Sequence, residues 1–277
     1  MIEEIDAHRC FGGQQLRFKH RSKVLDCEMN FSVFLPSAVE GGKVPVIYWL
    51  SGLTCTDENF VTKAGAQQYA EEAGVAIVAP DTSPRGEGIP DDPEAAYDFG
   101  LGAGFYVNAT QEPWRKHYQM YAYIVDELPG LLNDLPVNTD RASIMGHSMG
   151  GHGAMTIALK NPEKFKSVSA FSPICSPINC PWGEKALGHY LGDDREKWKP
   201  YDTCELIKAA EQKLPVLVDQ GEADDFLAGQ LKTELLVKAA AEVNYEMDVR
   251  MQPGYDHSYF FIASFIGEHI RFHRQFL

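Results

Sequence analysis

The sequence predicts an α/β protein in which a mostly parallel central sheet is covered by helices on both faces. Two observations indicate this fold class. Short apolar runs alternate along most of the chain with longer amphipathic segments, as in successive strand–helix units. Several of the short runs are apolar at nearly every position, which is typical of strands buried on both faces of a parallel sheet.

Seven segments are expected to form strands. In chain order they are 31–35, 44–50, 75–79, 142–145, 167–171, 214–218 and 245–251. The second (VPVIYWL) and third (VAIVA) are continuous apolar runs. The last (YEMDVRM) alternates between polar and apolar residues, so we expect it at an edge of the sheet.

Five longer segments are expected to form helices. They are 59–73, 117–132, 148–160, 226–243 and 259–276. Gly74 directly follows the first of them, where glycine is favoured as a C-terminal stop. No repeat, low-complexity tract or linker-like boundary interrupts the alternation, so we expect residues 1–277 to form a single domain.

Two stretches do not follow the alternation of strands and helices. Residues 82–113 are rich in Gly, Pro and Asp, and residues 172–204 are rich in Pro, Cys, Trp and Gly. Long irregular segments in a compact domain are uncommon and often form binding loops or lids. We expect both stretches to be loops that border an active site.

Charge and composition exclude several classes of function. The chain has 39 acidic and 25 basic side chains and a formal charge of −14, which argues against binding to nucleic acid or to an anionic membrane. We expect no membrane span, because no apolar run approaches the roughly 20 residues needed. The acidic N-terminus lacks the features of a signal peptide. We therefore expect a cytoplasmic protein with reduced cysteines.

The six cysteines do not indicate a metal site. Cys175 and Cys180 are separated by four residues, but no second Cys/His pair lies nearby in the sequence. Structural zinc sites need four ligands. We expect no metal and no cofactor.

The sharpest chemical signal is the segment Gly146-His147-Ser148-Met149-Gly150-Gly151. It lies between an expected strand and an expected helix. In that context G-x-S-x-G is typical of the nucleophile of an α/β-hydrolase, where the serine occupies a strained turn and its neighbours must be small. The alternative is a glycine-rich turn with a helix-capping serine. We expect an α/β-hydrolase fold with Ser148 as nucleophile.

A general base must follow the nucleophile in this fold, where the chain order is Ser, acid, His. Of the later histidines, His257 is favoured because it lies in a loop between the last strand and the last helix. His152 lies on the helix after Ser148, and His189 stays open as an alternative. His269 and His273 are expected on the solvated face of the terminal helix.

The orienting acid is expected just beyond the strand at 214–218. Asp224 is our choice, because the Gly-x-x-Asp spacing suits a turn that directs a carboxylate inward. Asp225 is the second choice. Asp219 is expected to belong to the strand, and Asp256 is too close to His257 in sequence to orient it.

The tetrahedral intermediate of acyl transfer needs two N–H donors. One is expected from Met149, the residue after the nucleophile. The other is expected from the loop after the strand at 44–50, where the peptide of Gly52 and Leu53 is the natural candidate. The alternative is an ordinary strand-to-helix turn.

Beyond these pieces, the chain resembles the S-formylglutathione hydrolases, the esterase D family of serine hydrolases. The resemblance runs nearly end to end and rests on blocks far more specific than G-x-S-x-G. The blocks are 50–56 (LSGLTCT), 79–86 (APDTSPRG), 100–106 (GLGAGFY), 146–154 (GHSMGGHGA), 176–183 (SPINCPWG), 224–227 (DDFL) and 254–259 (GYDHSY). Glu222 is a local departure, because the family often has lysine there.

The resemblance implies a cytoplasmic, often dimeric enzyme of glutathione-dependent formaldehyde detoxification that cleaves S-formylglutathione to formate and glutathione. It implies the triad Ser148, Asp224 and His257, with oxyanion donors Leu53 and Met149. A pocket is expected from side chains of the matching blocks. They are Trp182, Cys55, Phe105 and Tyr106.

Other functions remain open at this point. The same triad would serve a general short-chain carboxylesterase, a thioesterase or an acyltransferase, and an α/β-hydrolase can also be a catalytically dead binding module. The carboxylates of glutathione call for local positive charge, for which Arg85 and Lys185 are candidates unless they are ordinary surface residues.

Overall fold

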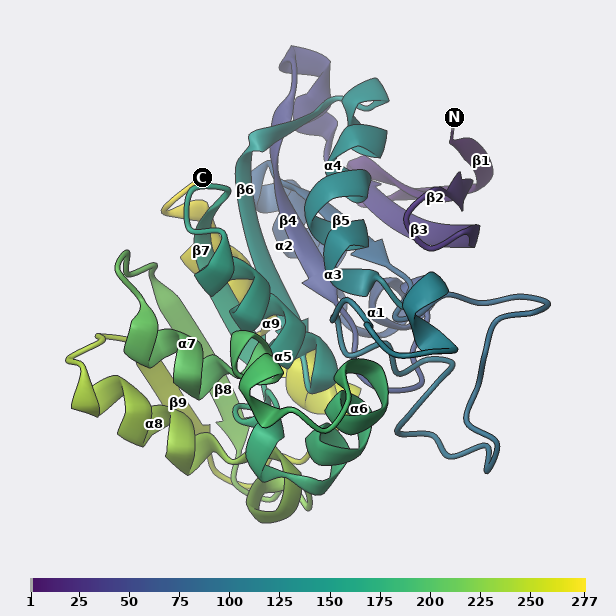
Figure 1. The fold of residues 1–277 in the computed structure, drawn as a ribbon. Coiled ribbons are helices and arrows are strands. Elements are labelled where there is room, and N and C mark those ends of the chain that lie inside the picture. Colours follow the sequence, from purple (N-terminus) through teal and green to yellow (C-terminus); the bar gives the residue numbers. More distant parts are fainter. Residues whose placement is uncertain (1) are drawn as a thin grey trace.

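The computed structural model of the chain describes residues 2–277, whose nine strands form one sheet (Figure 1). The strands are β1 (Glu3–Cys10), β2 (Gly13–Ser22), β3 (Cys27–Leu35), β4 (Val44–Leu50), β5 (Ala76–Pro80), β6 (Val137–His147), β7 (Phe165–Phe171), β8 (Val216–Gly221) and β9 (Asp248–Gln252). Their spatial order is β1-β2-β3-β5-β4-β6-β7-β8-β9. The expected α/β class with a mostly parallel sheet is confirmed.

The sheet is parallel from β5 to β9 and antiparallel from β1 to β5. β1 and β2 were not among the expected strands. In β2 the buried side chains of Leu16, Phe18, His20 and Ser22 alternate with more exposed ones, a period of two that could have revealed the strand. β1 is exposed along almost its whole length and has no such pattern.

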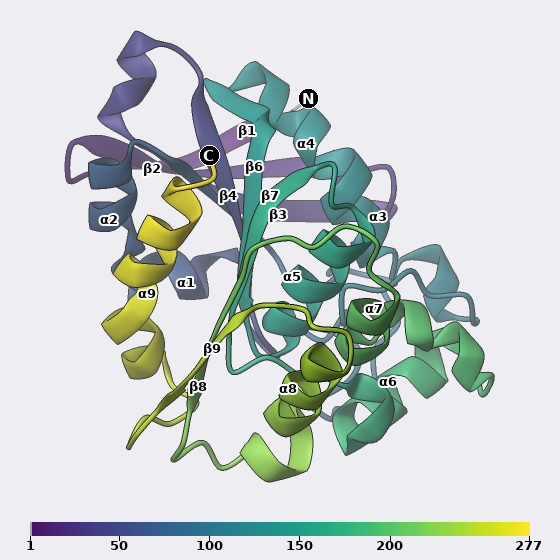
Figure 2. The ribbon, with the colours of Figure 1, turned by 90° about the vertical axis from the view of Figure 1, so that its left-hand side faces the viewer.

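Helices cover both faces of the sheet (Figure 2). They are α1 (Asp57–Lys63), α2 (Ala66–Ala73), α3 (Met120–Ala122), α4 (Leu128–Leu131), α5 (Met149–Lys160), α6 (Pro181–Leu191), α7 (Thr203–Ala209), α8 (Thr233–Glu242) and α9 (Tyr259–Arg274). α1, α2 and α9 lie on one face, and α3 to α8 lie on the other. Each face has its own apolar core, as a sheet buried on both sides requires. Among the helices of residues 2–277, none is both long and apolar enough to cross a membrane.

Three expected helices are broken in the structure. The segment 59–73 divides into α1 and α2 at Gly65, which has φ +64°. In the segment 226–243, Lys232 at φ +58° separates a π-helical turn at Leu227–Leu231 from α8. Another π-helical segment, Tyr123–Glu127, joins α3 and α4 within 117–132. Apolar periodicity does not reveal a single residue at positive φ, as at Gly65 and Lys232, or a local change from α-helical to π-helical turns, as at Tyr123–Glu127.

The two expected loops differ. Residues 82–113 contain no helix or strand, as expected. Residues 172–204 do not form an irregular loop: they contain α6 and short 3₁₀ turns, and α7 starts within them. α6 begins with Pro181 at its first position, where proline is favoured. The proline content that suggested a loop therefore marks the start of a helix.

The parallel strands align their carboxyl ends at one edge of the sheet. Ligands bind at this edge in open α/β sheets, because the loops that follow the strands converge there. The loops after β4, β6, β8 and β9 contribute Leu53, Ser148, Asp224 and His257. The strand expected at 245–251 begins later, at Asp248, where its pairing with β8 starts opposite Leu217.

Candidate active site

Ser148 lies on the tight turn between β6 and α5, with φ +57° and ψ −119°. This conformation is strained for a residue other than glycine. The turn requires both flanking glycines: a Cβ on Gly146 would lie 2.2 Å from the Gly150 carbonyl oxygen, and a Cβ on Gly150 would lie 2.0 Å from that of Leu50. The spacing G-x-S-x-G therefore follows from steric exclusion around the serine.

His257 and Asp224 form a close pair beside this serine. His257 Nδ1 donates to Asp224 Oδ2 at 2.6 Å. Burial would raise the pKa of Asp224, but the hydrogen bonds from His257 and from the Phe226 amide outweigh it and lower that pKa. Asp224 therefore stays ionised at neutral pH. Asp225, the second choice for this position, is exposed and forms no part of the pair.

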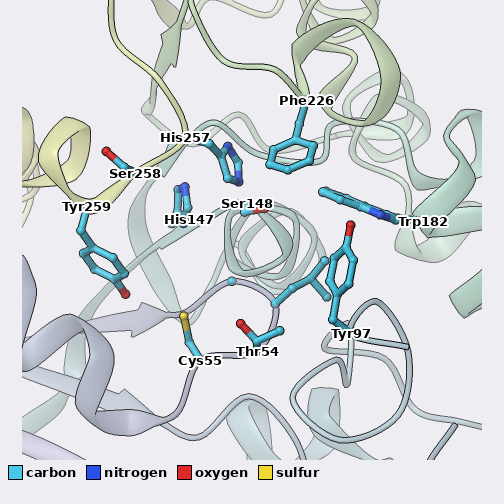
Figure 3. Close-up of a pocket in the computed structure, with 12 residues that line it drawn as sticks. Thr54, Cys55, Tyr97, His147, Ser148, Trp182, Phe226, His257, Ser258 and Tyr259 are labelled. Carbon is cyan, nitrogen blue, oxygen red and sulfur yellow. The ribbon is translucent and has the colours of Figure 1, made fainter. Parts of the chain in front are cut away.

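The free edge of the His257 ring faces Ser148 across a pocket (Figure 3). In the part of the chain that the structure describes, no hydrogen bond yet joins Ser148 Oγ to this ring. Such contacts are often long without substrate and tighten in the reactive complex. The arrangement can activate a hydroxyl nucleophile, with the carboxylate holding the imidazole in the tautomer that accepts a proton at Nε2.

The loop after β4 approaches the nucleophile closely. A Cβ on Gly52 would lie 3.1 Å from the Ser148 Cβ, so the peptide of Gly52 and Leu53 passes directly beside the serine. Met149 is the first residue of α5, where backbone N–H groups have no partner within the helix. Both expected N–H donors thus belong to backbone beside Ser148, which suits an oxyanion site.

A cavity of about 250 Å³ opens over the serine. Its lining residues are Gly52, Leu53, Thr54, Cys55, Tyr97, His147, Ser148, Trp182, Phe226, His257, Ser258 and Tyr259. Trp182 and Cys55 were expected in the pocket, and both line it. Phe105 and Tyr106 were also expected there, but they do not line it.

Phe105 and Tyr106 are fully buried behind the pocket. The Tyr106 hydroxyl donates to the Ser51 carbonyl (2.9 Å), and the Phe105 carbonyl accepts from His152 Nε2 (2.9 Å). These two aromatics therefore support the loop after β4 and helix α5 from within the core. The expectation of a substrate contact was wrong. A sequence block shared with a family does not distinguish residues that line a pocket from residues that support it from the core.

Aromatic side chains that were not among the expected pocket residues form one end of the pocket. Phe226 packs edge-on against His257, with ring centroids 5.0 Å apart, and lies 4.8 Å from Trp182. Tyr97, from the segment 82–113, packs edge-on against the other side of Trp182 at 6.1 Å. Tyr259 lies at the opposite end with Cys55 (Figure 3). Only folding joins these loops, so no local pattern could have grouped them.

His147 also went unrecognised, although it stands next to the nucleophile. Its ring centroid lies 4.4 Å from that of His257, and its Nε2 has no hydrogen-bond partner among residues 2–277. Burial, with a smaller contribution from repulsion by His257, holds the pKa of His147 well below its ordinary value. A neutral imidazole therefore packs against the candidate base.

The remaining histidines lie outside the pocket. His189 is exposed on α6. His269 and His273 do not lie on a solvated face as expected: both are fully buried against the sheet. Both rings project from α9 toward β7 and β8, where polar side chains form hydrogen bonds with them.

Hydrogen bonds join these two buried rings into one directed chain. Asp219 accepts from His269 Nε2 (3.0 Å), so His269 Nδ1 must accept from the Ser169 hydroxyl (2.8 Å). Ser169 in turn accepts from His273 Nε2 (2.8 Å), and His273 Nδ1 accepts from Ser167 (2.7 Å). Burial lowers the pKa of both rings, so both imidazoles are neutral, and in this chain of hydrogen bonds each carries its proton on Nε2.

The two cations considered for substrate binding are already paired. Arg85 binds the Asp81 carboxylate (2.9 Å) and the Cys55 carbonyl (3.0 Å). Lys185 binds Asp92 (3.0 Å) and Asp98 (2.7 Å). Neither lines the pocket. Within residues 2–277, no group of three His, Cys, Asp or Glu side chains is arranged to hold a metal ion.

Comparison with known proteins assigns the family. Residues 22–272 match the family described as "Putative esterase". The chain is 53% identical to S-formylglutathione hydrolase of Mus musculus over 279 residues, which covers 100% of this chain and 99% of the relative. The chain belongs to the S-formylglutathione hydrolase group of this esterase family. It is thus a hydrolytic enzyme, a serine esterase.

Solved structures agree with this assignment. This esterase superposes with a TM-score of 0.97 on an S-formylglutathione hydrolase from Agrobacterium tumefaciens, which is 46% identical, with 99% of each chain covered. The fluorophosphonate-binding serine hydrolase F of Staphylococcus aureus is 19% identical and gives a TM-score of 0.77, over 95% of this chain and 99% of that one. At this low identity, the second comparison shows only that the two proteins share their fold.

Proposed function

We propose that this enzyme hydrolyses S-formylglutathione to formate and glutathione through a formyl-enzyme on Ser148. One observation carries the proposal: a chain this similar to S-formylglutathione hydrolases has the His257–Asp224 pair facing the strained Ser148 across one pocket. The proposal assigns catalysis to Ser148, His257 and Asp224, and the oxyanion to the N–H groups of Leu53 and Met149.

In the acylation half, Ser148 Oγ attacks the formyl carbon while His257 Nε2 accepts the hydroxyl proton. The carbonyl oxygen becomes an oxyanion between the two N–H groups, and ionised Asp224 stabilises the imidazolium. The C–S bond then breaks. Thiols ionise near pH 8.5, so glutathione leaves as a thiolate more readily than an alcohol leaves as an alkoxide. The His257 imidazolium gives its proton to the departing sulfur, so the imidazole is neutral again before water enters.

In the deacylation half, water replaces glutathione. His257 takes a proton from the water as its oxygen attacks the formyl carbon, and then returns a proton to Ser148 Oγ as the ester bond breaks. Formate leaves, and the serine is regenerated. The protein side chains and backbone supply each of these steps, so the proposal includes no metal and no cofactor.

The glutathione part of the substrate needs a cation, because it carries carboxylates and the chain has a net charge of −14. Arg85 and Lys185 are paired with acids, whereas no carboxylate of residues 2–277 forms an ion pair with exposed Lys63. Lys63 Nζ lies 5.5 Å from the centre of the Tyr259 ring, which lines the pocket. We propose that Lys63 attracts a glutathione carboxylate at that end.

The decisive experiment compares hydrolysis of S-formylglutathione with that of a short-chain nitrophenyl ester. We expect a kcat/KM of about 10⁵ M⁻¹s⁻¹ or more on the thioester, well above the ester. Fast ester cleavage with slow thioester cleavage would reject the proposed substrate in favour of a general carboxylesterase. Failure of a fluorophosphonate probe to label Ser148 would instead indicate a catalytically inactive binding protein.

The family resemblance further supports a cytoplasmic homodimer that serves formaldehyde detoxification. Light scattering on the eluting protein tests the dimer, and formaldehyde sensitivity of a strain that lacks the enzyme tests the role. A monomeric mass, or unchanged sensitivity, would contradict the respective part.

A further inference from the structure

We infer that Lys185 is a positioning residue that holds Tyr97 over the aromatic end of the pocket and thereby limits the acyl groups the enzyme accepts. The inference rests on the proposed function of this pocket and extends it to acyl selection. It assigns a role to an ion-pair cluster outside the catalytic groups and to a pocket side chain from the segment 82–113.

The first step concerns the wall itself. Tyr97 belongs to a segment without helix or strand and is 55% exposed, yet it lines the pocket. Its ring stands at 84° to that of Trp182, which is itself 6% exposed. Together with Phe226, these side chains form an aromatic row from Tyr97 through Trp182 to the His257 ring (Figure 3).

The second step concerns what holds this wall. Loops without regular structure are mobile unless their side chains tie them down. Lys185 Nζ binds Asp92 (3.0 Å) and Asp98 (2.7 Å), which lie on either side of Tyr97 in the sequence. Asp98 is its immediate neighbour, so this ion pair restrains the Tyr97 backbone directly.

The third step joins the two. Lys185 stands three residues after Trp182 on α6, so both side chains project from adjacent turns of the same helix. One helix thus supplies one half of the aromatic pair and the cation that fixes the other half. The hydrogen bond to Asp98 raises the pKa of Lys185, so the cation stays charged at neutral pH.

The expected consequence is a chain-length effect. With Tyr97 held against Trp182, the aromatic end accepts a formyl or acetyl group and disfavours longer acyl chains. Releasing the loop should widen this end. The ratio of kcat/KM for nitrophenyl butyrate to that for nitrophenyl acetate reports the change, because both esters share one leaving group.

The experiment measures this ratio in Lys185→Met, Lys185→Arg and Tyr97→Ala. We expect the ratio to rise at least fivefold in Lys185→Met and Tyr97→Ala, and to stay nearer wild type in Lys185→Arg, which keeps the charge. The double variant should show no further rise. Glu184→Gln is the matched control, since it breaks an exposed ion pair with Arg195 on the same helix and should leave the ratio unchanged.

Several results would overturn the inference. An unchanged ratio in Tyr97→Ala would show that Tyr97 limits no acyl group, and an unchanged ratio in Lys185→Met alone would show that the ion pairs do not hold it. A rise in KM for S-formylglutathione with a constant ester ratio would place glutathione at this end. If Lys185→Met fails to fold, Asp98→Asn removes the same restraint from the loop side.

These outcomes are distinct from a failure of the proposed function. The ester ratio requires only an active serine esterase, whereas turnover of S-formylglutathione by the unaltered enzyme tests the substrate. If the unaltered enzyme hydrolyses S-formylglutathione slowly but the butyrate-to-acetate ratio still rises in the variants, the proposed substrate is rejected. The role of Lys185 and Tyr97 in limiting the acyl group is then retained.

Discussion

At the scale of single residues, neighbouring side chains of the same type have very different environments. Asp224 is buried and hydrogen-bonded to His257, while Asp225 is exposed. His147 and His257 are close together, yet only His257 has a carboxylate partner. The proposed chemistry depends on these differences, so matched pairs of substitutions can test it.

We expect Asp224→Asn to lower kcat by about 10⁴, because an amide cannot stabilise the imidazolium and favours the wrong tautomer of His257. Asp225→Asn should change kcat less than twofold. Steady-state hydrolysis of a nitrophenyl ester by both variants measures the difference. Equal losses in the two variants would contradict the assignment of Asp224 as the orienting acid.

Lys63→Gln should raise KM for S-formylglutathione several-fold and leave the kinetics of neutral nitrophenyl acetate unchanged. The effect should shrink as salt is added, because an exposed cation attracts a carboxylate through a screened interaction. Lys238→Gln, an exposed lysine on α8, is the control. The role of Lys63 would be rejected if KM rose equally for the neutral ester.

At the scale of elements, the pocket is made by the ends of strands and by loops that hold one another. The Gly102 carbonyl accepts from the Thr54 amide (2.9 Å), and the Cys55 carbonyl accepts from Arg85 (3.0 Å). The segment 82–113 therefore supports the loop after β4 that carries the expected Leu53 donor. Small changes in this loop should alter catalysis before they alter folding.

Gly52→Ala tests the close approach of this loop. Its Cβ would lie 3.1 Å from the Ser148 Cβ and 3.3 Å from the His147 carbonyl oxygen, so the loop must shift. We expect kcat to fall about ten- to hundredfold, near the loss of one oxyanion donor, with little change in thermal stability. Gly229→Ala adds a methyl group with no atom within 4 Å and should retain full activity. An unchanged kcat in Gly52→Ala would show that the loop accommodates the added methyl group without moving the expected oxyanion donor.

At the scale of the whole molecule, two cores flank the sheet, and several neutral histidines are buried in them. Burial lowers the pKa of His152 to about 4 and holds the pKa of His147 and His273 well below the ordinary value. The pKa of His269 is also lowered by burial, although its bond to Asp219 opposes the shift. Unfolding frees all four rings to bind protons near pH 6.5.

We expect acid to destabilise the fold well before its carboxylates titrate. At about pH 7.5 and above, these histidines are mostly neutral in both states and contribute little pH dependence. As the pH falls from 6.5 toward 4, only the unfolded chain binds the protons, so the free energy of unfolding should fall by about 1 kcal/mol per pH unit for each histidine. Urea unfolding between pH 7.5 and 5 measures this slope.

Two variants test whether the buried histidines cause this dependence of the free energy of unfolding on pH. His152→Asn and His273→Asn should each reduce it by about one proton, whatever their effect on stability at pH 7.5, because each removes a ring that only the unfolded chain protonates. A free energy of unfolding that stays constant from pH 7.5 to 5 would contradict the account.

Different physical signals explain which features could be predicted from the sequence. The strands near Ser148 were predicted because burial on both faces leaves continuous apolar runs, and Asp224 and His257 because chain order and strand ends restrict the choice. β1 was missed because it is exposed on both faces and has no apolar pattern. The positions of Tyr97 and Phe226 depend on how loops far apart in sequence meet, which no local periodicity encodes.

The chain of donors through His269 and His273 has a spectroscopic consequence. Each ring holds a hydrogen-bonded proton on Nε2 deep in the protein, where exchange with solvent is slow. These two protons should give resolved imidazole resonances, with nitrogen shifts that identify one and the same tautomer. The rings lie against β7 and β8, away from the candidate active site. Their resonances should therefore report whether the core around α9 is folded, and should not shift when a ligand binds.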